Sequence, residues 1–171
     1  MRSLILGGAR SGKSRFAEKL ALDSGKEVIY IATGWAGDEE MADRIAHHRQ
    51  RRPLSWLTVE EPVSLAQSML AHAASHRCLI VDCLTLWLSN LLAHDDLLFQ
   101  QQRSALLDIL PGLPGTLFMI SNEVGHGIVP ANPLARRFVD EAGWLHQDLA
   151  GKCERVYWIV AGLPQMLKGQ P

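Results

Sequence analysis

The sequence predicts an α/β fold in which a mostly parallel β-sheet carries helices on both faces. Short apolar runs bounded by turn residues alternate with longer amphipathic segments along all 171 residues. A glycine-rich loop ending in a lysine separates the first apolar run from the first amphipathic segment. That strand–loop–helix order is typical of proteins that bind phosphate. No repeat or linker interrupts the alternation, so we expect residues 1–171 to form one domain.

The first strand and helix flank this loop. Residues 4–6 form the apolar strand and residues 15–22 the helix, and the sequence between them is Gly7-Gly8-Ala9-Arg10-Ser11-Gly12-Lys13-Ser14. Its G-x-x-x-x-G-K-S spacing brings backbone N–H groups and a helix N-terminus to the phosphates. We expect Lys13 to pair with the β- and γ-phosphates of a purine nucleoside triphosphate, and Ser14 to ligate Mg²⁺. The alternative is an ordinary glycine-rich turn with a chance lysine.

Polar residues follow the next predicted strands. Residues 27–32 form the second strand, and Thr33 and Gly34 stand at its carboxyl end, where α/β folds bind ligands. Residues 56–60 form a third strand and residues 61–74 a helix. The strand at 77–82 is apolar until it closes on Asp82. A carboxylate there can hold Mg²⁺ directly or through water, as phosphate-loop enzymes require. The alternative is a solvent-exposed acid at a strand end.

A histidine pair lies on the helix predicted between the second and third strands, at residues 38–52. On a helix, Arg44 and Arg52 lie one turn on either side of His48, whereas His47 lies on a neighbouring face. Guanidinium groups on both sides lower the pKa of an imidazole, which leaves it neutral and nucleophilic near pH 7. Spacing alone favours the alternative, a solvated basic helix face. A metal site is disfavoured because adjacent helical positions diverge by about 100°.

The alternation continues to the end of the chain. We expect helices at 84–92, 97–110 and 134–149, strands at 116–121 and 156–160, a loop at 122–133 and an irregular tail after residue 162. Trp87, Trp144 and Trp158 lie among apolar residues and are expected in the core. His72 and His76 are one helical turn apart, but without an evident acid or thiol partner a surface helix is expected.

Composition narrows the class of protein. A formal net charge of −1 argues against nucleic-acid binding through bulk electrostatics. The three cysteines form no C-x-x-C motif and suit reduced thiols, and we expect Cys78 and Cys83 to be buried. No apolar run approaches the roughly 20 residues of a membrane span. The chain begins directly with a core strand, so no cleavable signal is expected. These features predict a cytoplasmic enzyme.

Further motifs extend over nearly the whole chain. They are GGARSGKSR at 7–15, YIAT at 30–33, E-M-x-x-R-I-x-H-H-R at 40–49, R-P-x-x-W at 52–56, N-E-V-G-x-G-I-V-P at 122–130 and L-A-R-x-F at 134–138. In these motifs the chain resembles the bifunctional adenosylcobinamide kinase/adenosylcobinamide-phosphate guanylyltransferase family of cobalamin biosynthesis. The first motif indicates only a phosphate loop, whereas the His-His-Arg helix and the Asn-Glu-Val-Gly loop are specific. One departure is His146, where relatives carry asparagine.

The resemblance implies a RecA-like sheet and two linked reactions. Members of the family phosphorylate the aminopropanol hydroxyl of adenosylcobinamide with ATP or GTP. They then transfer GMP from GTP to the new phosphate through a guanylyl-histidine, which would form on His48. The resemblance also implies a homotrimer, in which one subunit's helix can approach another's phosphate loop. By resemblance, the residues around the nucleotide are Ala32, Thr33, Gly34, Arg49, Gln50, Arg51, Arg52, Glu60 and Asp82.

Two other functions stay open at this point. One is a simple phosphate-loop kinase for a small molecule, in which the histidine pair has no chemical role. The other is a nucleotide-dependent switch without catalysis. The kinase donor, the residues that contact the corrinoid and the general base are not identified by the sequence.

Overall fold

The computed structural model describes residues 1–35, 53 and 55–170. The described residues form a seven-stranded sheet with the strand order β3-β2-β4-β5-β1-β6-β7. The strands are β1 (Arg2–Gly7), β2 (Glu27–Ala32), β3 (Leu57–Glu60), β4 (Arg77–Asp82), β5 (Thr116–Asn122), β6 (Arg155–Val160) and β7 (Leu163–Lys168). The helices are α1 (Lys13–Asp23), α3 (Leu65–His72), α4 (Leu84–Leu92), α5 (Asp96–Ile109) and α6 (Pro133–Lys152), with a 3₁₀ turn at Leu110–Gly112.

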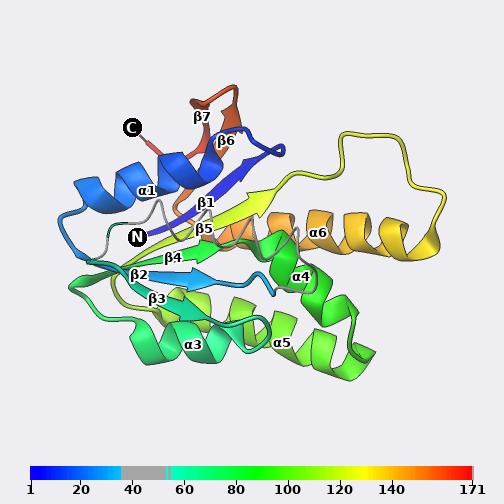
Figure 1. Cartoon of the computed structure of the whole chain (residues 1–171), viewed down its shortest axis with the longest axis horizontal. Helices are drawn as coiled ribbons and strands as arrows, with labels where there is room; N and C mark the ends of the chain where they lie inside the picture. Colours follow the sequence, from blue (N-terminus) through cyan, green and yellow to red (C-terminus); the bar gives the residue numbers. More distant parts are fainter. Residues whose placement is uncertain (36–52, 54, 171) are drawn as a thin grey trace.

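The sheet is parallel from β3 to β6, as the sequence predicts, and antiparallel only between β6 and β7. All of the parallel strands therefore end at the same edge of the sheet. The loop after β1, the ends of β2 and β4, and the long loop from β5 to α6 lie along that edge (Figure 1). This is where α/β folds bind ligands.

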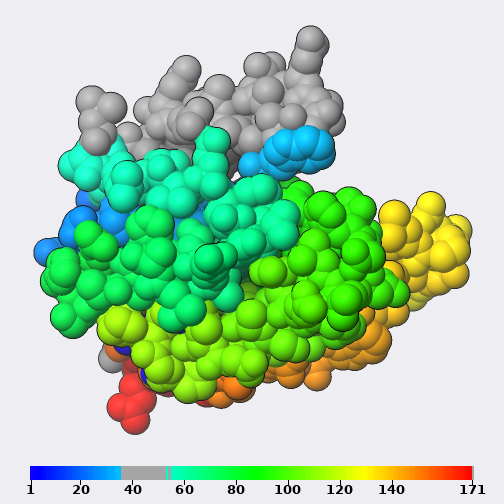
Figure 2. All heavy atoms as spheres, turned by 90° about the horizontal axis from the view of Figure 1, so that it is seen from below, coloured from blue at the N-terminus to red at the C-terminus, as the bar shows by residue number. Residues whose placement is uncertain are grey.

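Helices cover both faces of the sheet. On one face, Ala17 and Ala21 of α1 pack in a cluster with Ile5, Ile80 and Phe118. On the other face, α3, α4, α5 and α6 pack in a larger cluster. Because both faces are covered, successive residues of the central strands are buried in opposite clusters, and the strands read as continuous apolar runs. Figure 2 shows α3, α4 and α5 side by side on the second face, with the loop before α6 protruding at one end.

Three expectations from the sequence are wrong. The tail after Gly162 is not irregular, because it forms β7. Helix α3 begins at Leu65 rather than at residue 61, since the side chain of Glu61 accepts hydrogen bonds from the backbone N–H groups of Val63 and Ser64 and forms a turn there. Trp144 is not a core residue, since 54% of it is exposed.

Other expectations are confirmed. Trp87 is fully buried and donates its indole N–H to the carbonyl of Val63, 2.7 Å away. Cys78 and Cys83 are buried free thiols. The predicted helix at 38–52, with its histidine pair, lies outside the described residues. None of the helices in the described ranges is long and apolar enough to cross a membrane.

Candidate active site

The phosphate loop joins β1 to α1 at the carboxyl edge of the sheet. At Gly7, an added Cβ would lie 2.5 Å from the carbonyl oxygen of Ile159. Gly12 has a φ of +99°, and its added Cβ would lie 3.1 Å from the Cα of Gly162. Gly162 also donates its backbone N–H to the carbonyl of Ser11, 2.8 Å away. The loop therefore requires glycine at both positions, because β6 packs against Gly7 and the β6–β7 turn packs against Gly12.

Lys13 begins α1 and is only 7% exposed. Its Nζ donates to the carbonyl oxygen of Gly8, 2.6 Å away, so the side chain folds back over its own loop. Burial lowers the pKa of Lys13, and the nearby charge of Asp82 acts in the opposite direction. A desolvated ammonium interacts strongly with a phosphate, because little water competes for it. Its position suits a ligand bound across the loop.

Ser14 meets the strand-end acid that the sequence singled out. Its Oγ donates to Oδ2 of Asp82 over 3.0 Å, and the Tyr30 hydroxyl donates to the same oxygen. A hydroxyl and a carboxylate are oxygen ligands of the kind that Mg²⁺ prefers. The described part of the chain contains no group of three His, Cys, Asp or Glu side chains that could hold a metal. Mg²⁺ commonly binds one or two carboxylates together with substrate phosphates and water, so this donor set fits it.

The ends of β2, β3 and β4 bring further predicted site residues together. Ala32 is paired in register with both Glu60 and Asp82. Thr33 is fully buried, and its Oγ1 donates to the carbonyl of Cys83 at 2.6 Å and accepts from the Cys83 N–H at 2.9 Å. Its hydroxyl is therefore engaged within the protein, and it fixes the end of β2 against the start of α4. Gly34 follows it at the same edge.

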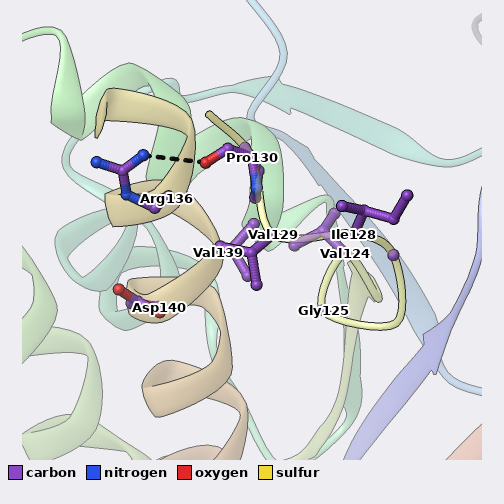
Figure 3. Close-up of a pocket in the computed structure, with 9 residues that line it drawn as sticks. Val124, Gly125, Ile128, Val129, Pro130, Arg136, Val139 and Asp140 are labelled. Carbon is purple, nitrogen blue, oxygen red and sulfur yellow. Dashed lines mark hydrogen bonds between the residues drawn. The ribbon is translucent and has the colours of Figure 1, made fainter. Parts of the chain in front are cut away.

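The loop that carries the Asn-Glu-Val-Gly motif and the start of α6 enclose a hollow of about 160 Å³. Figure 3 shows Val124, Val129 and Val139 among the residues that line it, with Arg136 and Asp140 on α6 at one side. The guanidinium group of Arg136 donates to the carbonyls of Pro130 and Ala131 and so holds the loop to the helix. Ile128, at the tip of the loop, is 98% exposed.

The structure thus brings Gly7–Ser14, Ala32, Thr33, Gly34, Glu60 and Asp82 to one edge of the sheet. The other candidates lie outside the described residues; they are His48, Arg49, Gln50, Arg51 and Arg52. Sequence reasoning missed Tyr30, which donates to Asp82, because a tyrosine inside an apolar strand gives no signal of its partner.

The family model for cobinamide kinase / cobinamide phosphate guanyltransferase matches residues 3–167. The chain belongs to this family. It is 60% identical over 172 residues to the bifunctional adenosylcobalamin biosynthesis protein CobP of Pseudomonas aeruginosa, covering 100% of this chain and 99% of that protein. It is 39% identical over 182 residues to the bifunctional adenosylcobalamin biosynthesis protein CobU of Escherichia coli, covering 98% and 100%. The resemblance in the motifs is therefore confirmed.

Two solved structures share the fold of this cobinamide kinase family member at low sequence identity. One is a Pyrococcus horikoshii protein studied as PH0250, with a TM-score of 0.54 and 9% identity over 99% of this chain and 87% of that one. The other is the flagellar accessory protein FlaH of Methanocaldococcus jannaschii, with a TM-score of 0.50 and 14% identity over 99% and 78%. The expected class, an α/β fold with a mostly parallel sheet and helices on both faces, is confirmed.

Proposed function

We propose that this chain carries out both reactions of its family on adenosylcobinamide. It phosphorylates the aminopropanol hydroxyl with ATP or GTP, and then transfers GMP from GTP to that phosphate. The observation that carries the proposal is the phosphate loop itself, with Ser14 Oγ 3.0 Å from Asp82 in a chain that matches the family from residue 3 to 167. A phosphate loop alone would support only nucleotide binding.

In the kinase step, the backbone N–H groups of the loop hold the phosphates of the donor nucleotide. Lys13 exchanges the carbonyl of Gly8 for phosphate oxygens, where its charge stabilises the transferring group. Ser14 and Asp82 hold Mg²⁺, which neutralises charge on the β- and γ-phosphates when it is bound. Tyr30 fixes the Asp82 carboxylate by donating to Oδ2, the oxygen that also accepts from Ser14.

In the second step, a ring nitrogen of His48 attacks the α-phosphorus of GTP and pyrophosphate leaves. An oxygen of cobinamide phosphate then attacks the same phosphorus and releases the histidine. This assignment rests on the family resemblance and on the arginines predicted around His48. We further propose that the chain is a single domain that assembles as a homotrimer. In our proposal the remaining residues around the nucleotide are Ala32, Thr33, Gly34, Arg49, Gln50, Arg51, Arg52 and Glu60.

GTP carrying radioactive phosphorus at the α-position tests the proposal. The wild-type chain should retain covalent label that is labile in acid and comparatively stable in alkali, as expected of a histidine adduct rather than a serine ester. His48→Ala should lose the label and still bind nucleotide. The matched control His47→Ala should keep the label, because the two histidines would lie on different faces of the helix that the sequence predicts.

Each other outcome identifies a different error. Phosphate on cobinamide without covalent label would leave a simple kinase, and binding without any transfer would leave a nucleotide switch. Loss of label in His47→Ala but not in His48→Ala would move the nucleophile by one residue. Normal labelling of both variants would refute the guanylyl-histidine mechanism.

A further inference from the structure

Glu123 directly follows β5, the strand between the one that ends at Asp82 and the one that leads into the phosphate loop. Strand β5 lies between β4, which ends at Asp82, and β1, which ends at Gly7. In register, Asp82 is opposite Ile120 and Gly7 is opposite Asn122, so β5 extends past the end of β4. The backbone N–H of Glu123 then donates to the carbonyl of Gly7, 3.0 Å away, at the first residue of the phosphate loop. The backbone of Glu123 is thus next to the loop at the ligand-binding edge.

The Glu123 carboxylate accepts one hydrogen bond and lies near a histidine. Its Oε1 accepts the backbone N–H of Gly125 over 2.6 Å, and its Oε2 lies 3.8 Å from Nδ1 of His146 on α6. The side chain of Glu123 remains 18% exposed, so a bound molecule can reach it. Gly125 leaves room for this arrangement, since an added Cβ there would lie 2.9 Å from Oε1. One carboxylate oxygen is therefore held by the turn that follows β5, in a residue whose backbone bonds the start of the phosphate loop.

His146 is a buried histidine that the proposed reactions do not otherwise use. Its side chain is 9% exposed, and its Nε2 lies 2.7 Å from Oγ of Ser121, which is fully buried. Burial lowers the pKa of His146, while the charge of Glu123 opposes that shift, and the neutral ring is favoured. When Ser121 donates to Nε2, the ring proton is on Nδ1 and faces Glu123. A neutral ring in this tautomer turns its N–H dipole toward the carboxylate across 3.8 Å, too far for a hydrogen bond, and leaves the carboxylate charged.

We propose that Glu123 is the general base of the kinase step and that His146 and Ser121 position it. The proposal rests on the proposed function. As the substrate hydroxyl oxygen attacks the γ-phosphorus, Oε2 of Glu123 accepts the hydroxyl proton. The bond between the γ-phosphorus and the bridging oxygen breaks, and the nucleoside diphosphate leaves with the bonding pair. The protonated Glu123 then returns its proton to water.

A purely structural role for Glu123 makes a different prediction. If the carboxylate only stabilised the turn at Gly125, its loss would impair both reactions and the stability of the fold together. A general base acts on the hydroxyl alone. The second reaction starts from a phosphate that carries no such proton, so GMP transfer to preformed cobinamide phosphate is an internal control.

The test is Glu123→Gln, which keeps an acceptor oxygen for the Gly125 N–H and removes the basic group. We expect the kcat of cobinamide phosphorylation to fall about 100- to 10,000-fold, with KM nearly unchanged. Covalent labelling by GTP and GMP transfer to preformed cobinamide phosphate should stay near wild-type rates. The matched control is Asp108→Asn, since this exposed acid lies near the end of α5, which leads to the opposite edge of the sheet. It should leave both reactions unchanged.

His146 is tested separately as a positioning residue. His146→Leu should lower the kcat of phosphorylation about 10-fold through misplacement of the base, without lowering GMP transfer. His146→Asn supplies an amide N–H in place of the ring N–H and should restore most of the rate. Full phosphorylation by His146→Leu, or equal loss of both reactions, would overturn the positioning role.

The failures can be told apart. Wild-type protein that does not phosphorylate cobinamide would refute the proposed function and this inference together. If the wild-type protein is active and Glu123→Gln phosphorylates cobinamide within about 10-fold of its rate, the inference alone is refuted. If Glu123→Gln does not fold, Glu123→Asp retains a base on a shorter arm. This variant should keep measurable phosphorylation of cobinamide. If phosphorylation is lost completely while GMP transfer and stability are unchanged, the assignment of Glu123 as the base is refuted.

Discussion

The substitution Lys13→Met should change the free energy of unfolding little but strongly lower the rate of phosphorylation. The Lys13 ammonium is 7% exposed, and its hydrogen-bond partner in the described structure is the neutral carbonyl of Gly8. Removing it forfeits a charge-assisted hydrogen bond of about 1.5–3 kcal/mol. It also removes a desolvated charge, and exposed Gly8 can bond water instead. Because apolar replacement of buried charges is often neutral or stabilising, we expect the free energy of unfolding to change by no more than about 1 kcal/mol.

Activity should respond very differently. The Lys13 charge is placed to stabilise phosphate oxygens in the transition state, and loss of one such donor typically costs about 100- to 1,000-fold in kcat, or about 2.7–4 kcal/mol. The assay is transfer of labelled γ-phosphate to cobinamide, measured beside urea unfolding of the same preparations. Phosphorylation within about 10-fold of wild type by a folded variant would refute the role of the loop. A large loss of stability together with activity would refute the argument about the buried charge.

The pH dependence of the free energy of unfolding gives an independent check that the Lys13 ammonium is buried. The pKa of Lys13 in the folded protein lies below its usual 10.5 because of burial. Between the lowered and the usual pKa, the unfolded chain holds a proton that the folded protein has released. The free energy of unfolding contributed by Lys13 therefore rises with pH in that window. Relative to Lys13→Met, the wild-type protein should become more stable as the pH is raised from neutral toward 10.5.

Two further substitutions test the site. Asp82→Asn keeps the size of the side chain but removes its charge, so phosphorylation should fall and need more Mg²⁺; an unchanged Mg²⁺ titration would contradict the assigned ligand. Gly12→Ala places a Cβ 3.1 Å from the Cα of Gly162 at a φ of +99°, and we expect a loss of about 1–3 kcal/mol in the free energy of unfolding. The control is Gly112→Ala, where nothing lies within 4 Å of the added Cβ and unfolding in urea should change little.

The elements that the sequence predicts well are those with strong local signals. The bounds of β2 and β4 agree with the expected strands at 27–32 and 77–82, because turn residues flank continuous apolar runs there. Lys13, Ser14 and Asp82 could likewise be predicted, since each follows a recognisable pattern in its own segment. Trp144 could not, because its neighbours on α6, Ala142 and Leu145, are buried while its own position faces outward.

Contacts between segments that are distant in the sequence shape the rest of the site. Strand β7 shows why the sequence does not reveal such contacts. Leu163–Lys168 is almost entirely exposed and contains a proline, which sheets tolerate at an edge, so it shows no alternating pattern. It pairs with β6 across Ala161 and Gly162, whose φ values are +50° and +80°. A two-residue hairpin turn of type I′ needs positive φ at both positions, and alanine gives only a weak signal for it. Yet the N–H of Gly162 bonds the carbonyl of Ser11. The end of the chain therefore fixes the shape of the phosphate loop at its beginning.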